Sequence, residues 1–346
     1  MAVHGTSLDF DGCIFNQAYM GGGTGTYRDV IRSNKVFLDR LKKENDLFTK
    51  NYTFVGSSRQ SYSFDLGCAT HNSNGSCFPA IKIISDYLHT TLDPILLADI
   101  FGNLKFGTSY ERAMDSTYIG EHAEPMFDPS KVILIYAQIH RLANIHPDEE
   151  IIFDFYDDYG PILDSLKAFY ERAPHLMPAN VTFRLHRYVD GVCTPQGEIK
   201  GTGFIDEHFT ETVKDMINIS ESSKIKAYNA GTWYGPPTSR GEANVAKWVN
   251  LDLLQTRKAL HKHSDLAHSS ESITKVDETK SADFMDESYK KILGNLAHIT
   301  VTKRSGGVDE VVHVADDTSS VLMQNEKTLS EVDATNCESV LSQKLF

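Results

Sequence analysis

The first two hundred residues alternate between short apolar runs and longer segments with helical periodicity, and this alternation constrains the fold more than any other feature. Strands are expected around 6–10, 52–56, 150–156 and 181–189. Helices are expected at 27–50, over most of 79–120, at 128–144 and at 160–172. Such alternation predicts an α/β fold, in which a parallel sheet is covered by helices on both faces.

The character of the chain changes after about residue 200. Helical patterns are expected at 205–225 and 240–263, a polar linker or exposed loop at 264–285, and a β-hairpin at 299–314. We therefore expect a domain at 1–200 and a smaller C-terminal module at 201–346, which is mainly helical, contains the hairpin and ends in a flexible acidic tail. No residue pattern in this module predicts a particular chemistry.

Charge and cysteine usage exclude several classes of protein. The formal net charge of −13 argues against a nucleic-acid-binding protein, which would carry a basic face. The five cysteines are scattered and have neither zinc-ligand spacing nor a disulfide pattern, which favours a reducing compartment. The N-terminus lacks the features of a signal peptide, and the longest apolar runs are too short to span a membrane. The sequence thus predicts a soluble protein.

Polar clusters follow three of the expected strands at the points where these strands end. They are Asp9 with Asp11, the Ser57-Ser58-Arg59 turn, and Asp157 with Asp158. In open α/β sheets, functional residues gather at the carboxyl ends of the strands. We therefore expect these side chains to form one site.

Asp9 and Asp11 have the spacing of a pair in which one carboxylate acts as nucleophile and the other as general acid and base. One carboxylate could attack phosphorus while the other, protonated, donates a proton to the leaving oxygen. A surface Asp-x-Asp before glycine is also often only a turn. At the second strand, the Ser57 hydroxyl, nearby backbone N–H groups and the Arg59 charge could bind a phosphoryl oxygen, although such turns are more often helix caps.

Lys131 opens the helix that precedes the strand ending at Asp157. A lysine there opposes the helix dipole, so binding of carboxylates and phosphate explains it better than helix stabilisation does; a solvated surface lysine is the alternative. Asp154, Asp157 and Asp158 follow or interrupt an apolar run and would repel one another unless a cation such as Mg²⁺ were bound. A loop of solvated acids is the alternative for this group.

In order along the chain, LDFDG, FVGSSR, Lys131 at a helix start and a strand ending in Asp-Asp resemble the four-motif signature of haloacid dehalogenase-like hydrolases. The resemblance covers about residues 5–190. It implies a Rossmann-like domain and a phosphatase that acts through an aspartyl-phosphate. It also implies Asp9 as nucleophile, Asp11 as general acid/base, Ser57 as phosphoryl-binding residue with Ser58 and Arg59 beside it, Lys131 as stabiliser of the intermediate, and Asp9, Asp11, Asp157 and Asp158 as Mg²⁺ site.

The fourth motif of this signature fits the sequence in two ways. Asp154 with Asp158 matches its spaced-acid form, whereas Asp157 with Asp158 matches its adjacent form. We prefer Asp157 and Asp158, because the apolar run then ends where the acids begin.

The exact sequences of the motifs are similar to those of a narrower group of proteins. LDFDGCIFN, GSSRQS, DPSKVILIYAQIHRLA and FDFYDDYGPIL resemble translocated bacterial effectors of the Legionella type IV secretion kind, some of which are phosphotyrosine phosphatases. This resemblance implies secretion into a host cell and a phosphorylated protein or peptide as substrate. The mostly helical insertion at 60–125, beside an open site, also favours a protein side chain over a small metabolite.

Other functions remain compatible with the same residues. A small-molecule phosphatase, a nucleotidase or a phosphotransferase would use the same site, and an inactive phosphatase-like binding protein would keep only the fold. In the C-terminal module, basic residues could contact an anionic membrane surface or a host protein, or simply form a solvated helical face. They are Lys224, Lys226, Arg240, Lys247, Arg257, Lys258 and Lys262. We expect a monomer.

Overall fold

The computed structural model describes residues 2–15, 29–65, 76–221, 243–271, 301–305 and 308–312. The chain divides into two compact units, residues 1–268 and 269–346. The glycine-rich loop at 21–26, the loop at 71–75 and the acidic tail lie outside the described residues. The candidate site belongs to the first unit.

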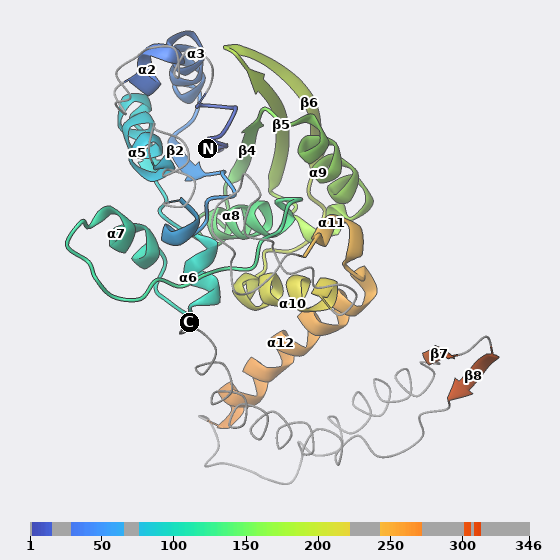
Figure 1. The fold of residues 1–346 in the computed structure, drawn as a ribbon. Helices are drawn as coiled ribbons and strands as arrows, with labels where there is room; N and C mark the ends of the chain where they lie inside the picture. The colour runs from blue at the N-terminus through green and yellow to red at the C-terminus, as the bar shows by residue number, and fades with distance from the viewer. Residues whose placement is uncertain are drawn as a thin grey trace, which may run out of the picture. The chain divides into compact units, whose positions relative to one another are not determined.

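A six-stranded sheet with the order β3-β2-β1-β4-β5-β6 forms the centre of the first unit (Figure 1). Its strands are β1 (Ala2–Leu8), β2 (Lys50–Val55), β3 (Thr91–Leu92), β4 (Glu150–Asp157), β5 (Val181–Val189) and β6 (Val192–Lys200). The first five strands are parallel, as predicted, and β6 runs antiparallel to β5. The α/β class is confirmed, but the sheet is mixed rather than wholly parallel.

The antiparallel strand β6 was not predicted from the sequence. It follows a two-residue turn in which Asp190 and Gly191 both have positive φ, 48° and 83°, as the tightest hairpin turns require. Pro195 and Gly197 weaken the strand pattern of 192–200. Proline is tolerated here because β6 is an edge strand: among the described strands, only β5 pairs with it.

Helices cover both faces of the sheet, as expected (Figure 1). On one face pack α2 (Asp29–Ser33), α3 (Lys35–Asn45) and α5 (Cys77–Leu88). On the other pack α6 (Leu97–Phe101), α8 (Val132–Ile145), α9 (Gly160–Arg172), α10 (Phe209–Glu221) and α11 (Val245–Trp248). Alternate strand residues serve the two cores: Phe155 of β4 belongs to the α8 side, whereas Tyr156 belongs to the α3 side.

Several predicted boundaries differ from those of the structure. The helix expected at 27–50 is two helices, α2 and α3, and β2 already begins at Lys50. The segment 79–120 also contains α7 (Thr108–Met114) and the short strand β3. The helix α12 (Leu251–Glu271) continues past residue 263, so residues 264–271 of the expected linker are helical.

The boundary expected at residue 200 lies within the first unit, because α10 packs on α8 and α6 and α11 packs on α8 and α9. In the second unit, β7 (Val301–Ser305) and β8 (Val308–Val312) pair antiparallel, which confirms the predicted hairpin. Within the described parts of the chain, no helix combines the length and apolar character that crossing a membrane requires.

Candidate active site

Asp9 and Asp157 leave two adjacent parallel strands at the same edge of the sheet. Leu8 of β1 pairs with Tyr156 of β4, and the Asp9 N–H donates to the Tyr156 carbonyl at 2.9 Å. From β1 the chain crosses to β2 on one side, whereas β4 lies on the other side of β1. Sheets of this kind bind ligands where the strand order reverses in this way. The sequence prediction that these two acids meet is thus realised in the structure.

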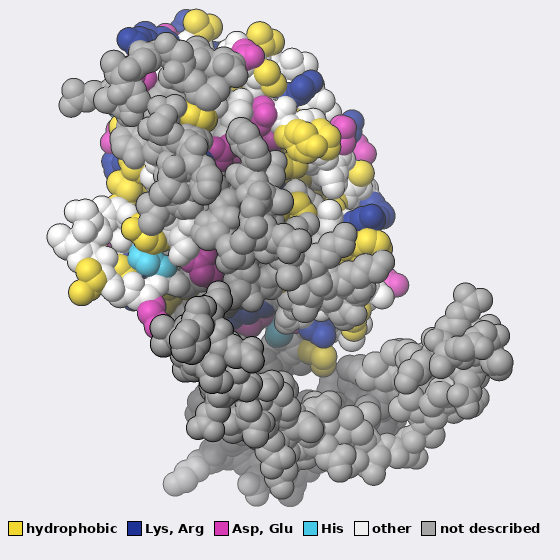
Figure 2. Space-filling model, in the orientation of Figure 1, with side chains coloured by type: hydrophobic (Ala, Val, Ile, Leu, Met, Phe, Trp, Pro, Cys, Tyr) yellow, Lys and Arg dark blue, Asp and Glu magenta, His cyan; other side chains and the backbone are white. Residues whose placement is uncertain are grey.

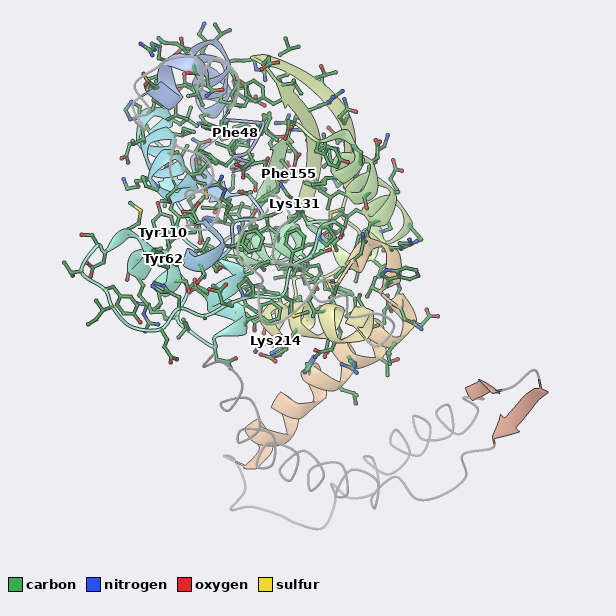
Figure 3. All side chains as sticks on the ribbon, in the orientation of Figure 1. Phe48, Tyr62, Tyr110, Lys131, Phe155 and Lys214 are labelled. Atoms are coloured by element: carbon green, nitrogen blue, oxygen red, sulfur yellow. The ribbon has the colours of Figure 1, made fainter. Side chains whose placement is uncertain are left out.

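Lys131 joins these two carboxylates. Its Nζ donates to Asp9 Oδ1 at 2.8 Å and to Asp157 Oδ2 at 2.7 Å, and its side chain is only 3% exposed. The ammonium group lies 5.4 Å from the centroid of the Phe155 ring, beside which Lys131 is seen in Figure 3. The second oxygen of Asp157 accepts a hydrogen bond from the Tyr159 N–H at 2.8 Å. The lysine is therefore a buried bridge between carboxylates and not a solvated surface charge.

Lys131 has an unusual backbone conformation. It stands just before α8, with a left-handed φ of 58°, whereas the sequence analysis placed it in the first turn of the helix. A non-glycine residue in this region costs on the order of 1 kcal/mol, and such strain is concentrated at functional sites. The helix N-terminus is served instead by Asp128, which accepts from the N–H groups of Ser130 and Ile133 at 3.0 and 3.2 Å.

Asp158 completes a group of three carboxylates with Asp9 and Asp157. One oxygen from each lies within 4.8 Å of the others, a separation at which a single cation can bind all three. Gly12 approaches this group closely: its φ is 78°, and a Cβ atom there would lie 2.3 Å from Asp158 Oδ2. Only glycine fits this position without moving Asp158.

The carboxylates outnumber the positive charges near them. Burial raises the pKa of Asp9 to about 8; the Lys131 charge opposes this rise, and the Asp157 charge adds to it. Burial also raises the pKa of Asp158 to about 6, with a further contribution from Asp157. A divalent cation would relieve both effects, since carboxylate oxygens are the ligands preferred by hard cations such as Mg²⁺. The residues present thus fit the ion implied by the sequence.

Asp11 lies apart from this group, in a fork-like ion pair with Arg59. The Arg59 Nε and Nη2 donate to its two oxygens at 2.8 and 2.5 Å, and Arg59 Nη1 reaches Asp65 at 3.1 Å. Arg59 is buried and also lies over the Phe10 ring, whereas the Asp11 side chain is 47% exposed. The guanidinium expected to bind substrate is thus directed at Asp11 and Asp65, and nothing in the local sequence indicated these partners.

Ser57 and Ser58 follow β2 at the same edge of the sheet. The Gly56 N–H donates to the Leu8 carbonyl at 2.8 Å, which ties the end of β2 to the end of β1. Ser57 is buried, and its Oγ accepts from the Arg59 N–H at 3.3 Å. Among the residues that the structure describes, its hydroxyl hydrogen has no acceptor. This hydrogen is therefore available to a ligand oxygen.

A small cavity lies beside Lys131 and Ser58. Its volume of about 20 Å³ suits one water molecule, and its walls are mainly apolar. The rings of Phe64 and Phe127 stack there with centroids 5.6 Å apart. The surroundings of the lysine are therefore aromatic on this side.

Asp154 belongs to a different cluster. It is three residues before Asp157 on β4, so the two side chains point to opposite faces of the sheet. Its oxygens accept from His4 Nε2 at 2.7 Å, from His186 Nε2 at 2.9 Å and from Arg184 Nε at 2.6 Å. The sequence alternative that used Asp154 beside Asp158 is therefore not what the geometry brings together, because Asp158 follows the end of β4 and lies with Asp9 and Asp157.

The cluster around Asp154 also has the outline of a cation site, formed with His4 and Glu44. However, the Arg184 guanidinium already lies between Glu44 and Asp154, at 2.7 and 2.5 Å. A second positive ion would have to displace this arginine. We therefore regard the cluster as an internal salt-bridge network. His4 and Arg184 are residues that the sequence reading did not single out.

The basic residues noted in the C-terminal region are only partly described. Lys224, Lys226 and Arg240, and the side chain of Lys262, lie outside the described part. Arg257 pairs with Asp215 at 2.8 Å, and Lys258 donates to the Tyr136 hydroxyl at 2.7 Å. On the described surface in Figure 2, acidic and basic side chains are interspersed. Contact with a membrane or a host protein through this region stays a prediction.

Comparison of the chain with models of protein families, with curated proteins and with solved structures gave no match. The chemistry of the site is therefore inferred from its own residues.

Proposed function

We propose that this protein is a Mg²⁺-dependent phosphomonoester hydrolase of the haloacid dehalogenase kind, which works through an aspartyl-phosphate on Asp9. One observation carries the proposal. A single buried lysine bridges two buried carboxylates, Asp9 and Asp157, where β1 and β4 end, and the third carboxylate of Asp158 lies beside them. A nucleophile, a phosphate-binding cation and a metal-binding acid pair are thus available within one group.

The order of the strands supports a Rossmann-like domain. The site lies at the carboxyl ends of β1 and β4, at the point where the order β3-β2-β1-β4-β5 reverses. This is the arrangement expected of a Rossmann-like domain. The segment 60–125, expected as a helical insertion, contains α5, α6 and α7 but also β3, which pairs with β2 in the sheet.

The chain's own residues supply the groups that the reaction needs. An oxygen of Asp9 attacks phosphorus, and the leaving oxygen takes a proton from Asp11. Asp11 then removes a proton from the water that cleaves the aspartyl-phosphate. Lys131 and the Ser57 hydroxyl donate to the oxygens on which negative charge is concentrated. Arg59 fixes the position of the Asp11 carboxylate through two parallel hydrogen bonds.

Asp9, Asp157 and Asp158 would hold the metal. Bound there, Mg²⁺ would neutralise the charge of the phosphoryl group and orient it toward Asp9. The donor set consists of oxygens only, which favours Mg²⁺ over Zn²⁺, an ion that proteins bind mainly through nitrogen and sulfur.

We propose a phosphorylated protein side chain, phosphotyrosine in particular, as the substrate class. Phe127 is partly exposed and stacks on the buried Phe64 ring beside Lys131 and Ser58, so it offers an apolar surface to an aryl leaving group. The test is kcat/KM on matched phosphotyrosine, phosphoserine and phosphothreonine peptides and on a panel of small phosphate esters. Faster hydrolysis of a sugar phosphate or nucleotide than of every peptide would overturn this assignment.

The chemistry itself is tested with p-nitrophenyl phosphate, with and without Mg²⁺. Asp9→Asn should abolish turnover while the protein stays folded. A matched control is Asp99→Asn: Asp99 is also buried, but it accepts backbone hydrogen bonds at α6, from Gly107 and Ser109. The Asp99→Asn variant should keep native activity, provided that circular dichroism shows that it is folded. A folded Asp9→Asn variant with native activity would overturn the mechanism.

The same assay also distinguishes a phosphatase from a phosphotransferase and from an inactive binding protein. Adding alcohol acceptors and identifying the products distinguishes hydrolysis, which releases inorganic phosphate, from transfer to the acceptor. No turnover of any ester with any divalent cation would contradict the enzyme assignment.

A further inference from the structure

A cysteine and a histidine lie together on β5 and β6, away from the group around Asp9. Cys193 is a free, half-buried cysteine on β6, and it pairs with Tyr188 of β5. His186 is two residues before Tyr188, so both side chains point to the same face of the sheet. This is the face covered by α3, where Cys193 packs at the edge of the core. Neither Cys193 nor His186 has a part in the proposed phosphatase chemistry.

The ring of His186 is held in a fixed orientation. Its Nε2 lies 2.9 Å from Asp154 Oδ1, and the ring stacks on Tyr156 with centroids 4.6 Å apart and planes 14° from parallel. Asp154 is fully buried and is itself fixed by His4 and Arg184. Cys193 is the diagonal cross-strand neighbour of His186, and Nδ1 is the ring nitrogen that Asp154 does not occupy. The order Asp154, His186, Cys193 is the arrangement by which proteins activate a nucleophile.

Two positive groups act on the thiol. Partial burial raises the pKa of Cys193, but interactions with His186 and with Arg40 of α3 outweigh it and hold the pKa below its ordinary value. Burial lowers the pKa of His186, but the hydrogen bond to Asp154 and the interaction with Cys193 outweigh burial and raise this pKa to about 9. Among the described residues, further ionisable neighbours include the Tyr156 and Tyr188 phenols, the Arg184 guanidinium and the carboxylates of Glu44, Asp154 and Asp190.

We propose that Cys193, with His186 and Asp154, forms a reactive thiolate site that is modified by hydroperoxides. The thiolate sulfur attacks one peroxide oxygen, so an S–O bond forms and the O–O bond breaks. Sulfur is oxidised by two electrons to a sulfenic acid and the peroxide is reduced. The leaving hydroxide, or the alkoxide of an organic hydroperoxide, takes the proton of the His186 imidazolium and departs as water or alcohol. Asp154 is a positioning residue, which orients His186 and stabilises its protonated form.

Two other cysteines provide internal controls. Cys13 and Cys77 are fully buried, and burial raises the pKa of each well above its ordinary value. They should therefore react slowly in the folded protein. The contrast between these thiols and Cys193 can be measured within one sample.

The first experiment measures the ionisation of Cys193 in the full-length protein. Iodoacetamide labelling is followed by peptide mass spectrometry between about pH 5.5 and about pH 9.5, beside a synthetic peptide of residues 189–197 as unfolded reference. The midpoint for Cys193 should lie below that of the peptide. In His186→Gln it should rise by about one unit, which is a tenfold loss of thiolate at low pH. A midpoint at or above that of the peptide would overturn the proposal.

A second variant keeps the test valid if His186→Gln does not fold. Arg40 is exposed on α3, so Arg40→Gln should fold normally and should also raise the midpoint. Native-like labelling of Cys193 in both variants would show that neither group acts on the thiol, and would refute the site.

The second experiment measures sulfenic acid formation with hydrogen peroxide at about pH 6.5, trapped with dimedone. Each unit of pKa lowering raises the thiolate fraction about tenfold and reduces its intrinsic nucleophilicity about threefold, a net gain of about threefold. Cys193 should therefore react faster than the peptide, and Cys193→Ser should remove the trapped product. Equal rates for protein and peptide would contradict the assignment.

Discussion

The Nζ atom of Lys131 lies 2.8 Å from Asp9 Oδ1, although 122 positions separate the two residues in the chain. The same Nζ reaches Asp157, and Asp158 is the third acid of the group. One ammonium group thus faces three carboxylates. This imbalance determines how the site should respond to mutation, metal and pH.

Replacing Lys131 tests the bridge directly. Lys131→Met should lower kcat/KM for an aryl phosphate by about a hundredfold or more, because a preorganised donor to the reacting oxygens is lost. Lys214→Met is the control, since Lys214 of α10 pairs with Glu211 and Asn103 (Figure 3). Steady-state kinetics on both variants gives the comparison. A Lys131→Met enzyme within tenfold of the native rate would exclude an essential bridge.

Asp157 and Asp154 should differ in what they support. Asp157→Asn should weaken Mg²⁺ binding, measured by calorimetry, and should destabilise the fold less than Asp154→Asn does, because Lys131 keeps Asp9 as a buried partner. Asp154→Asn should leave Mg²⁺ binding nearly unchanged but destabilise the fold by about 3–5 kcal/mol, because it removes the buried partner of Arg184 and His186. Denaturant unfolding measures the second effect. The reverse pattern would move the metal site to Asp154.

The effect of Mg²⁺ on stability should depend on pH. The pKa of Asp9 is raised to about 8 by burial, so between about pH 4 and pH 8 the folded metal-free protein keeps a proton that the unfolded chain has released. Stability of the metal-free protein therefore falls as pH rises through this window. Mg²⁺ favours the ionised carboxylate, so it should raise Tm more at pH 8 than at pH 6. Thermal unfolding at both values tests this, and an equal rise would argue against binding at Asp9.

Gly12→Ala should damage the metal site through geometry alone. A Cβ at this position would lie 2.3 Å from Asp158 Oδ2, and its φ of 78° disfavours alanine by about 1 kcal/mol. We expect weaker Mg²⁺ binding together with this modest loss of stability. Gly160→Ala is the control, because no atom lies within 4 Å of a Cβ there. Unchanged Mg²⁺ affinity in Gly12→Ala would show that Asp158 is not a ligand.

Elements with a self-contained sequence pattern were predicted well. α9 begins with Gly160-Pro161 and ends at Arg172, and β5 alternates apolar and polar residues over 181–186, and the predicted and observed bounds of both elements agree. β6 was missed because Pro195 and Gly197 argue locally against a strand, whereas its position at the edge of the sheet depends on the tertiary fold. The Asp190-Gly191 turn was the available signal.

From the sequence, the site could be predicted only for the residues that directly follow the ends of strands. Asp9 and Asp157 follow adjacent parallel strands, and their meeting needs no knowledge of side-chain contacts. The pairing of Arg59 with Asp11 and Asp65, by contrast, depends on how the turn after β2 folds back over Phe10. The His186–Cys193 pair likewise requires the β5–β6 register, which was not predicted.

The left-handed backbone of Lys131 has a consequence for protein engineering. The conformation alone favours glycine or asparagine at position 131 by about 1 kcal/mol, but either residue would leave the buried Asp9 and Asp157 without their shared cation, which costs more. A library selected only for thermostability should therefore keep lysine at position 131 as long as both carboxylates are present. A gain from relaxing this backbone should appear only in variants that also lose the charge at position 9 or 157.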